Sequence, residues 1–274
     1  MVPRRAAVTG RVALVTGAGR GIGAATVLAL AGAGWSVLAV DRAADDPALP
    51  YPLASPADLA GVVRRAAEEA GSDARVHAVT ADVRDPAALA AAVTEAERRW
   101  GGLDAAIAVA GVIAGGVPLW EMPPAQQQAV LDVDLGGVLS LSRAAIPALL
   151  RRPAPRSGRF LAVASAAATR GLPMLAAYCA AKAGVAGLIR ALAAELAGSG
   201  VTANAVSPGS TATPMLAQSA RLYGLPGPEA FAGQQPAGRL LDPAEVAAVL
   251  AFLAGPASSG MTGAVVPVDG GLAL

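Results

Sequence analysis

Short apolar runs rich in β-branched residues alternate along this chain with longer segments rich in alanine and leucine. Such short runs are typical of buried strands, and the longer segments have the length of helices. The pattern predicts strands over residues 11–16, 36–40, 75–80, 103–109, 159–164, 201–206 and 264–268. It predicts helices over about 21–31, 57–70, 86–100, 124–151, 176–197 and 243–254. This alternation predicts one α/β domain over residues 1–274, with a doubly wound, seven-stranded parallel sheet flanked by helices.

Two stretches interrupt the alternation. Residues 43–56 contain four prolines and Tyr51, and they are too long for an ordinary connection between a strand and a helix. We interpret this insertion either as a surface loop or as a stiff flap over one end of a ligand. Ser55 is expected to cap the helix that follows it. Residues 210–241 carry little regular pattern, and we interpret them as a mobile substrate lid.

The composition narrows the classes of function. The 274 residues include 21 basic and 20 acidic ones, and the resulting net charge of +1 does not favour binding to nucleic acid. Only 15% of the residues are charged and 54% are hydrophobic, which predicts a large core, an oligomer interface or a membrane segment. The uncharged run 21–40 is divided by Gly32 and Gly34, which argues against a transmembrane helix.

The N-terminus and the rarest residue types exclude further classes of protein. The first ten residues, MVPRRAAVTG, lack the apolar segment of a secretory signal. A single cysteine, Cys179, excludes an internal disulfide, and with the single histidine, His77, it argues against a His/Cys metal site. We interpret both residues as structural and expect a soluble, cytoplasmic protein without a metal.

A glycine-rich turn follows the first predicted strand. Residues Thr16–Gly23 have the sequence TGAGRGIG and lead directly into a predicted helix. The glycines let the backbone approach a pyrophosphate, while the helix N-terminus supplies amide donors and the positive end of its dipole. The order of strand, glycine turn and helix predicts a dinucleotide site. The alternative is a glycine-rich turn without a ligand.

Polar residues at two further strand ends bear on which dinucleotide binds. Asp41 ends the second predicted strand, where a carboxylate can bond the adenosine ribose hydroxyls and repel a 2′-phosphate. That favours NAD over NADP, although the neighbouring Arg42 could accept such a phosphate. Asp82 follows the third strand, where it could bond the adenine amino group or cap the helix that starts near Pro86.

A tyrosine and a lysine four residues apart supply candidate chemistry. Tyr178 and Lys182 share one face of a predicted helix. A neighbouring ammonium stabilises a phenolate and moves its pKa toward the working range, so the pair could exchange a proton with a carbonyl or alcohol oxygen. The alternative is an ordinary helix with a buried aromatic and a surface lysine. Ser165 ends the fifth strand, so it is expected at the same sheet edge as the glycine turn.

Taken together, these motifs resemble the short-chain dehydrogenase/reductase family over essentially the whole chain. The motifs are TGAGRGIG, Asp82-Val83, Ser165 thirteen residues before Tyr178, the Tyr178-x-x-x-Lys182 pair and Pro208-Gly209. The resemblance implies a Rossmann fold and NAD-dependent interconversion of an alcohol with its ketone or aldehyde. It also implies that Tyr178 is the general acid/base, that Lys182 lowers its pKa and binds the nicotinamide ribose, and that Ser165 orients the substrate oxygen.

The same resemblance implies a set of cofactor-binding positions, and two of the family's positions are altered here. The cofactor set is Gly17, Arg20, Gly21, Ile22, Gly23, Asp41, Arg42, Asp82, Val83, Ala110, Gly111, Tyr178, Lys182, Pro208, Gly209, Thr211 and Thr213. The family's Asn-Asn-Ala-Gly is replaced by residues 108–111, AVAG, which lose polar contacts. The family's catalytic asparagine aligns with Asp134. An ionised carboxylate cannot donate a hydrogen bond, and its charge would raise the pKa of Tyr178. Asp134 is therefore either a tolerated substitute or a residue with its own role, and we expect Asp134→Asn to keep or increase activity.

A narrower resemblance concerns the insertion. Residues 40–54, residues 111–116 and the ending Asp269–Leu272 are similar to the mycofactocin-associated subfamily. That resemblance implies a nicotinoprotein, in which NAD does not exchange and an external redox partner reoxidises it. A stiff, proline-rich flap would lose little entropy when it orders over the adenosine, and this would slow cofactor release.

Several alternatives stay open at this point. The chain could be an ordinary dehydrogenase with exchanging NAD, a non-catalytic NAD sensor, or an isomerase or dehydratase on the same fold. The lid's apolar residues predict either a pocket for a hydrophobic secondary alcohol or packing onto the core; they are Met215, Leu216, Leu222, Tyr223, Leu225 and Phe231. The long apolar helices over 124–151 and 176–197 fit an oligomer, and the family resemblance implies a homotetramer.

Overall fold

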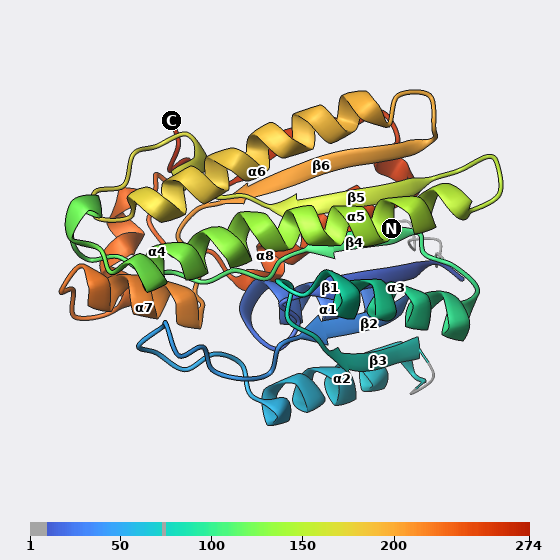
Figure 1. Ribbon diagram of the computed structural model, residues 1–274, viewed down its shortest axis with the longest axis horizontal. Helices are drawn as coiled ribbons and strands as arrows, with labels where there is room; N and C mark the ends of the chain where they lie inside the picture. Colours follow the sequence, from blue (N-terminus) through green and yellow to red (C-terminus); the bar gives the residue numbers. More distant parts are fainter. Residues whose placement is uncertain (1–9, 73–74) are drawn as a thin grey trace, which may run out of the picture.

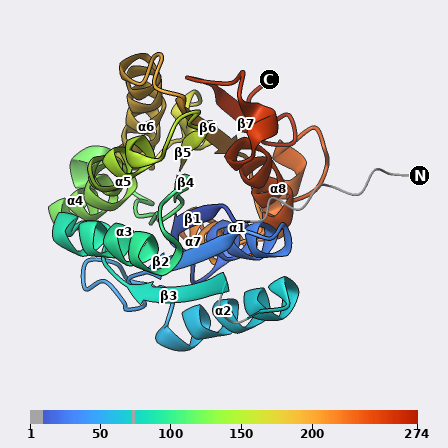
Figure 2. The same ribbon diagram turned by 90° about the vertical axis from the view of Figure 1, so that its right-hand side faces the viewer.

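Residues 10–72 and 75–274 are described by a computed structural model of the chain. Residues 1–9, which include most of the segment for which we expect no secretory signal, and residues 73–74 lie outside the described part. Seven strands form one parallel sheet in the order β3-β2-β1-β4-β5-β6-β7 (Figures 1 and 2). The strands are β1 (Val12–Thr16), β2 (Ser36–Asp41), β3 (Val76–Thr80), β4 (Ala105–Ala108), β5 (Gly158–Val163), β6 (Val201–Pro208) and β7 (Val265–Val268). Each lies within two residues of its predicted position, so the predicted α/β Rossmann fold is confirmed.

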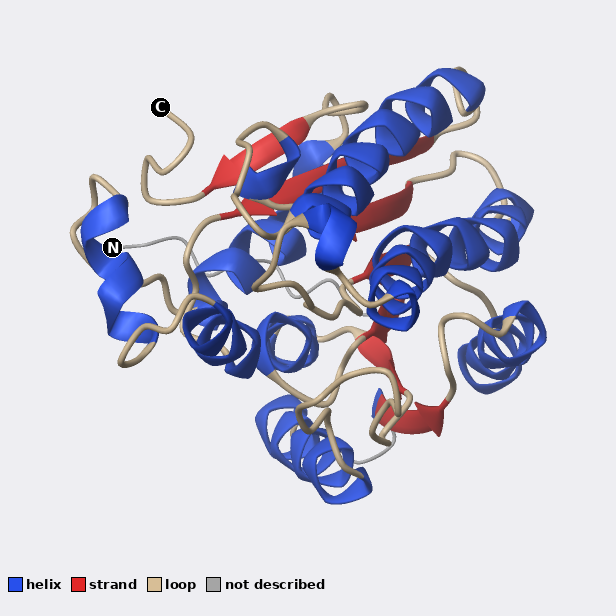
Figure 3. Ribbon diagram, turned by 60° about the vertical axis from the view of Figure 1, so that its left-hand side comes forward, coloured by secondary structure: helices blue, strands red, loops and turns tan. Residues whose placement is uncertain are grey.

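Helices cover both faces of this sheet (Figures 2 and 3). One layer holds α1 (Gly21–Gly32), α2 (Pro56–Ala70) and α8 (Pro243–Ala254). The other holds α3 (Pro86–Trp100), α5 (Gly137–Arg151) and α6 (Ala176–Glu195), with α4 (Pro124–Leu131) beside α6. Because both faces are covered, the central strands are buried on each side and consist of almost uninterrupted apolar residues. This is why the strands were visible as short apolar runs.

The predicted helix over 124–151 is interrupted in the structure. Between α4 and α5 the chain forms a π-helical segment, Asp132–Gly136. A π-helical turn contains an extra residue, which changes the direction of the side chains around it. Here Asp134 is fully buried, at 0% exposure. Gly137 follows directly, and a Cβ atom at this position would lie 2.6 Å from Cγ2 of Val83.

The helix caps confirm one expectation and correct another. Ser55 caps α2 in a capping box with Asp58, as its position before the helix predicts. The suggestion that Asp82 caps α3 is wrong, because the cap is Asp85, whose carboxylate accepts hydrogen bonds from the amides of Ala87 and Ala88. The Asp82 carboxylate instead accepts hydrogen bonds from the amide and the guanidinium of Arg84.

The lid over 210–241 is more regular than the sequence suggests. It contains α7 (Pro214–Leu222) and a 3-10 helix, Pro228–Gln234. Thr213 caps α7 by accepting a hydrogen bond from the Leu216 amide at 3.2 Å. The expectation of little regular structure is therefore wrong for these segments, because prolines at the first helical positions start helices there rather than break them.

Two helical stretches are long and apolar enough to span a membrane by length and hydropathy alone, Pro124–Arg151 and Ala176–Glu195. About half of the most apolar window of each is buried, 50% and 44%. Both pack on the sheet, α5 against β4 and β5 and α6 against β5 and β6. Core helices of an α/β fold satisfy the same two criteria, and we therefore assign these helices to the core.

Candidate active site

The carboxyl ends of the strands open into one large cavity of about 680 Å³. It lies where the chain leaves β1 and β4 in opposite directions, the position at which doubly wound sheets bind ligands. All of the cofactor positions named above line it, together with Ser165. The exception among the candidate catalytic residues is Asp134, which lies behind the cavity wall.

The glycine turn forms a cradle that suits a pyrophosphate. A Cβ atom at Gly23 would lie 1.9 Å from the carbonyl oxygen of Gly17, so no other residue fits there. Gly17 itself has a φ of +66°, and a Cβ atom there would lie 2.6 Å from the Ala110 backbone. The N-terminus of α1 has no capping side chain and no acidic residue in its first turn. Its positive end is therefore not neutralised by an acidic residue of the helix itself, which fits the phosphates of a dinucleotide.

Asp41 lies beside this cradle, at the end of β2. Its Oδ2 accepts a hydrogen bond from the Gly19 amide at 2.9 Å, and its Oδ1 accepts one from the Ala43 amide at 3.0 Å. The carboxylate is thus fixed against the glycine turn, where it can accept hydrogen bonds from the hydroxyl groups of an adenosine ribose. A 2′-phosphate at this place would meet a fixed negative charge, so the geometry fits NAD and disfavours NADP.

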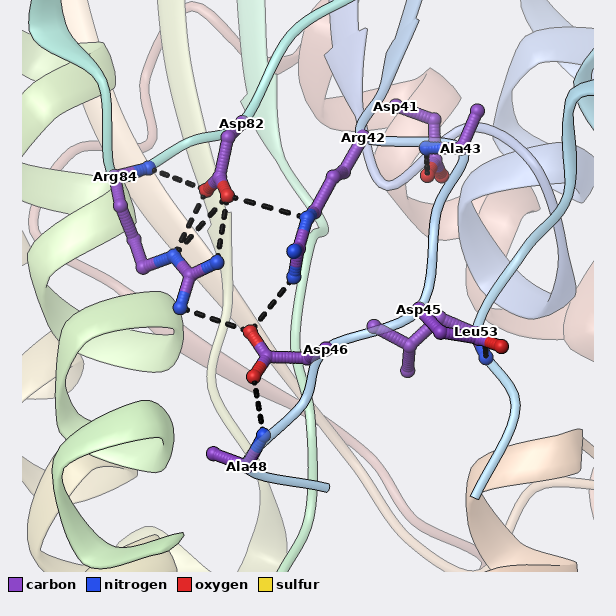
Figure 4. Close-up of polar contacts among 9 residues, drawn as sticks. All are labelled: Asp41, Arg42, Ala43, Asp45, Asp46, Ala48, Leu53, Asp82 and Arg84. Atoms are coloured by element: carbon purple, nitrogen blue, oxygen red, sulfur yellow. Dashed lines mark hydrogen bonds and ion pairs between the residues drawn. The ribbon is translucent and has the colours of Figure 1, made fainter. Parts of the chain in front are cut away.

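Arg42 is not available for a 2′-phosphate, because it belongs to a ring of four charged side chains (Figure 4). Its Nη1 lies 2.7 Å from Oδ2 of Asp46, and its Nε lies 3.4 Å from Oδ2 of Asp82. Arg84 completes the ring, at 2.9 Å from Asp46 and 2.6 Å from Asp82. The two carboxylates neutralise the two guanidiniums, and this removes the main argument for NADP.

The same ring perturbs the carboxylates that form it. Burial alone would raise the pKa of Asp46, but the Ala48 amide and the two arginines outweigh it and lower that pKa. The pKa of Asp82 is also lowered, because Arg84 outweighs the effect of burial. Both acids are therefore ionised at neutral pH, and the ring is a charged network at the adenosine end of the cavity.

The insertion, residues 43–56, is attached to the cavity wall at several points. Tyr51 is buried, and its hydroxyl oxygen accepts a hydrogen bond from the Ile113 amide at 2.9 Å. Burial raises the pKa of Tyr51 to about 12, so its phenol is neutral. Arg20 of the glycine turn donates from Nη1 to the Pro52 carbonyl at 2.8 Å. The insertion thus connects the glycine turn with the segment after β4, and Leu53 and Ala54 line the cavity.

The candidate catalytic residues come together from β5 and α6. Ser165 lies just beyond β5, and Tyr178 and Lys182 lie one helical turn apart on α6. Nζ of Lys182 lies 5.5 Å from the centroid of the Tyr178 ring and donates to the Val163 carbonyl at 3.2 Å. Tyr178 and Lys182 are almost fully buried, at 8% and 3% exposure, yet both line the cavity. This places a phenol, an ammonium and a hydroxyl at one point of the cavity wall.

Burial dominates the acid–base balance of the phenol. It raises the pKa of Tyr178 above the ordinary value of 10.0, while Lys182 and a hydrogen bond with Ser165 act to lower it and Asp134 acts to raise it. The expected lowering of the Tyr178 pKa by the Lys182 ammonium is present, but burial of the phenol outweighs it. The sign of the lysine effect is as expected, and its size is smaller than that of burial.

Comparison with known proteins agrees with this geometry. A family model described as Enoyl-(Acyl carrier protein) reductase matches residues 17–273. The cis-4-hydroxycyclohexanecarboxylate dehydrogenase of Sinomonas cyclohexanicum is 40% identical over 265 residues, which cover 95% of this chain and 96% of that protein. The chain belongs to the short-chain dehydrogenase/reductase family. It is an NAD-dependent dehydrogenase/reductase that acts on alcohol and ketone substrates.

Two solved structures of this family carry NAD. Carveol dehydrogenase from Mycobacterium avium in complex with NAD has a TM-score of 0.90 and 32% identity, over 97% of this chain and 98% of that one. A short chain dehydrogenase from Mycobacterium paratuberculosis bound to NAD has a TM-score of 0.85 and 31% identity, over 98% and 99% of the two chains. NAD is accordingly the cofactor of this enzyme.

Asp134, which the family resemblance aligns with a catalytic asparagine, contacts Lys182 directly. Its Oδ1 accepts a hydrogen bond from the Val112 amide at 2.7 Å. Its Oδ2 lies 3.2 Å from Nζ of Lys182 but off the hydrogen-bonding direction, so this contact is an ion pair. The pKa of Asp134 is raised, because burial outweighs the effect of Lys182, and the pKa of Lys182 is raised by Asp134 despite its own burial. The π-helical segment is the element that turns this carboxylate inward.

The far half of the cavity, beyond Tyr178, is mostly apolar. Of the six apolar lid residues expected there, Leu222 is the one that does not line it; its backbone and side chain pack against Gly116. The other five line the cavity, as do Leu172, Pro173 and Leu175 of the loop before α6. Tyr223 is fixed by a hydrogen bond from its hydroxyl to the Pro173 carbonyl at 2.7 Å.

Sequence reasoning missed three features of this site. The first is the seat of Tyr51 on Ile113, for which the only signal was a lone aromatic residue in a proline-rich insertion. The second is the charged ring, because Asp46 and Arg84 carry no motif. The third is Arg170, which lines the far half of the cavity and lies in a loop that the motifs do not cover.

Proposed function

We propose that this enzyme interconverts a hydrophobic secondary alcohol and its ketone with an NAD molecule that stays bound between turnovers. The observation that carries the bound-cofactor part is the attachment of the insertion at both ends of the adenosine site. Arg20 holds Pro52, Tyr51 holds the segment after β4, and Asp46 joins Arg42 to Arg84. We propose that these contacts slow the departure of NAD past the insertion.

Tyr178 is the residue that handles the proton. In the oxidation direction, its phenolate takes the hydroxyl proton of the alcohol while the carbon-bound hydrogen departs with its electron pair, which leaves a ketone. NAD, when bound, supplies the hydride acceptor or donor. Ser165 holds the substrate oxygen next to Tyr178, and the Lys182 ammonium stabilises the phenolate. Asp134 fixes Lys182 from behind through the ion pair. In the reduction direction the phenol returns the proton to the carbonyl oxygen.

The apolar far half of the cavity supports a ring-shaped or branched hydrocarbon substrate. Its walls include Leu175, Met215 and Phe231, and burial of such a substrate contributes about 25 cal/mol per Å² of apolar surface. The relatives named above are named for alcohols on six-membered rings, carveol and cis-4-hydroxycyclohexanecarboxylate. We therefore propose cyclic secondary alcohols as the first substrates to test.

Cofactor retention tests the proposal. NAD should co-purify with the protein through gel filtration and be released, in near-stoichiometric amount, on denaturation. Deletion of residues 44–55 should give a protein that loses NAD on the column and regains turnover when NAD is added. Cofactor-free wild-type protein that turns over normally with added NAD would instead identify an ordinary dehydrogenase with exchanging cofactor. Tyr178→Phe should retain NAD and lose turnover, whereas the output of a non-catalytic NAD sensor would not change.

The proposal extends to the surroundings of the enzyme. Because a resident NADH has to be reoxidised in place, we propose an external redox partner of the mycofactocin type, in a soluble cytoplasmic enzyme. We also propose a homotetramer built on the long apolar helices. In support, Leu139 of α5 is 40% exposed although it is a large apolar residue. Sedimentation velocity would measure the assembly, and a monomer at micromolar concentration would refute it.

A further inference from the structure

The two halves of the cavity differ in their charged residues. The adenosine half is lined by six of them: Arg20, Asp41, Arg42, Asp46, Asp82 and Arg84. Beyond the catalytic Tyr178 and Lys182, the lining within the described part of the chain is apolar or neutral except at one position. That position is Arg170, in the loop that leads from Ser165 to α6.

Arg170 is exposed to solvent at the edge of the cavity, where backbone contacts hold it. Its amide donates to the Ala166 carbonyl at 3.0 Å, and its Nη1 donates to the carbonyl of Leu272 in the C-terminal segment. That segment is itself fixed, because the Asp269 carboxylate accepts hydrogen bonds from the amides of Gly271 and Ala273, each at 2.9 Å. The guanidinium is therefore tethered at one nitrogen, while Nε and Nη2 make no hydrogen bond with any described residue.

The charge of Arg170 also has no counter-ion in the described part of the chain. The ion pairs there engage Arg42, Arg84 and other arginines, and no aspartate or glutamate lies within ion-pair distance of Arg170. A cation without a counter-ion at the edge of an otherwise apolar pocket attracts an anionic group on a ligand that reaches this edge. Two free N–H groups on one edge of a guanidinium match the two oxygens of a carboxylate.

We propose that Arg170 recognises a carboxylate on the substrate, so that the enzyme acts on an apolar hydroxy acid or the corresponding keto acid. This inference rests on the proposed function and names the substrate class for the same site. The carboxylate is a group of the substrate other than the reacting carbon, because Tyr178 handles the hydroxyl and Arg170 binds the acid. The carboxylate does not take part in the reaction and is unchanged by it. The hydroxyl proton passes to Tyr178, and the carbon-bound hydrogen passes to NAD as a hydride, with the electron pair of its bond. A phosphate dianion is a poorer match, because the far half offers one cation rather than two.

Matched substrates and variants test this inference. The probes are cis-4-hydroxycyclohexanecarboxylate, its methyl ester and cyclohexanol, compared in wild-type enzyme, Arg170→Gln, Arg170→Lys and Arg64→Gln. Arg64 lies on the exposed face of α2, outside the cavity, and controls for the loss of one positive charge. Binding of cyclohexanecarboxylate, which has no hydroxyl to oxidise, is measured by calorimetry as a readout independent of turnover.

The wild-type enzyme should prefer the acid to the ester, and Arg170→Gln should raise KM for the acid by about 10- to 100-fold with little change in kcat. The ester should be unaffected, Arg170→Lys should fall between, and Arg64→Gln should behave as wild type. Cyclohexanecarboxylate should bind to wild type and not to Arg170→Gln. Equal effects of Arg170→Gln on acid and ester, or a wild-type preference for the neutral alcohols, would overturn the inference while leaving the proposed function intact. Failure to oxidise any cyclic alcohol would instead refute the proposed function and, with it, this inference.

Discussion

Replacement of Asp134 by asparagine tests the most unusual part of the active site. The carboxylate faces two positive or proton-donating groups, the Val112 amide at Oδ1 and the Lys182 ammonium at Oδ2. An asparagine has one acceptor oxygen and one donor NH₂ group. If its oxygen keeps the hydrogen bond from the Val112 amide, its NH₂ group faces the Lys182 ammonium. In the reverse orientation, its NH₂ group faces the Val112 amide, so that two donors meet. An asparagine, the family's usual residue, would therefore lose one of these two stabilising contacts in this chain.

The separation of the ion pair sets the size of that loss. At 3.2 Å and an effective dielectric constant of about 20, the attraction between Asp134 and Lys182 is about 5 kcal/mol. Part of this offsets the cost of burying both charges, and removal of one partner from a buried pair costs about 3 kcal/mol. For a chain of this size, that corresponds to a fall in Tm of roughly 6–12 °C.

The same substitution should change the pH dependence of the reaction. Asp134 raises the pKa of both Tyr178 and Lys182, so its removal should lower both, and the pKa of Tyr178 falls as long as Lys182 stays protonated. Oxidation needs the phenolate, and its rate therefore rises with pH through the Tyr178 pKa. In Asp134→Asn the rise should occur at lower pH, and the activity near neutral pH should be kept or increased.

Thermal denaturation and a pH profile of kcat, both on NAD-loaded protein, provide the two readouts. Asp134→Glu keeps the charge and controls for the effect of altered side-chain length at this site. An unchanged Tm together with an unchanged pH profile would refute the reasoning. A loss of several orders of magnitude in kcat at every pH would show that the carboxylate has a catalytic role of its own.

Three further predictions concern the cofactor. Tyr51→Phe should keep the packing of the insertion but lose the hydrogen bond from the Ile113 amide. This loss should accelerate NAD release by roughly 2- to 10-fold, measured in a chase with labelled NAD. Tyr223→Phe, a control at the far end of the cavity, should not alter the release rate. Asp41→Ser should reduce the preference for NAD over NADP about tenfold in reconstituted enzyme, and an unchanged preference would contradict the role given to its carboxylate. The pKa values of Asp46 and Asp82 are below the ordinary 3.8, so their contribution to stability is complete above that value and is lost as the pH falls through the lowered pKa values. NAD should therefore be held down to about pH 4 and released below it, as monitored by rapid filtration, and Asp46→Asn should release NAD faster already at neutral pH.

The sheet and the cofactor loop were predictable because local patterns specify them. A buried parallel strand needs an apolar run, and runs such as β1 and β6 are found within two residues of their predicted positions. The glycine turn needs its residue type for a steric reason that acts locally, as the clash of a Cβ atom at Gly23 shows. Ser165, Tyr178 and Lys182 converge because strand ends and one helical turn are simple geometric constraints.

Other features depend on contacts between distant segments and were not predictable in this way. The π-helical segment follows the same apolar pattern as an ordinary helix, so the inward turn of Asp134 was hidden in the predicted helix. The sequence left two possible roles for Asp82. Whether Asp82 or Asp85 caps α3 depends on the residue at which the helix starts, which the sequence pattern does not specify. The pairing of Asp46 with Arg84 joins residues 38 positions apart, a contact that single-sequence patterns do not encode.

The central claim is that this enzyme oxidises an alcohol with the NAD that it already carries. The most direct measurement is an absorption spectrum of the purified protein before and after addition of cyclic alcohols, with no free NAD and no external electron acceptor. We predict the absorbance of reduced nicotinamide, appearing in a single turnover of about one equivalent per chain and absent in Tyr178→Phe. No change in the spectrum without free NAD, followed by steady turnover once NAD is added, would contradict the claim.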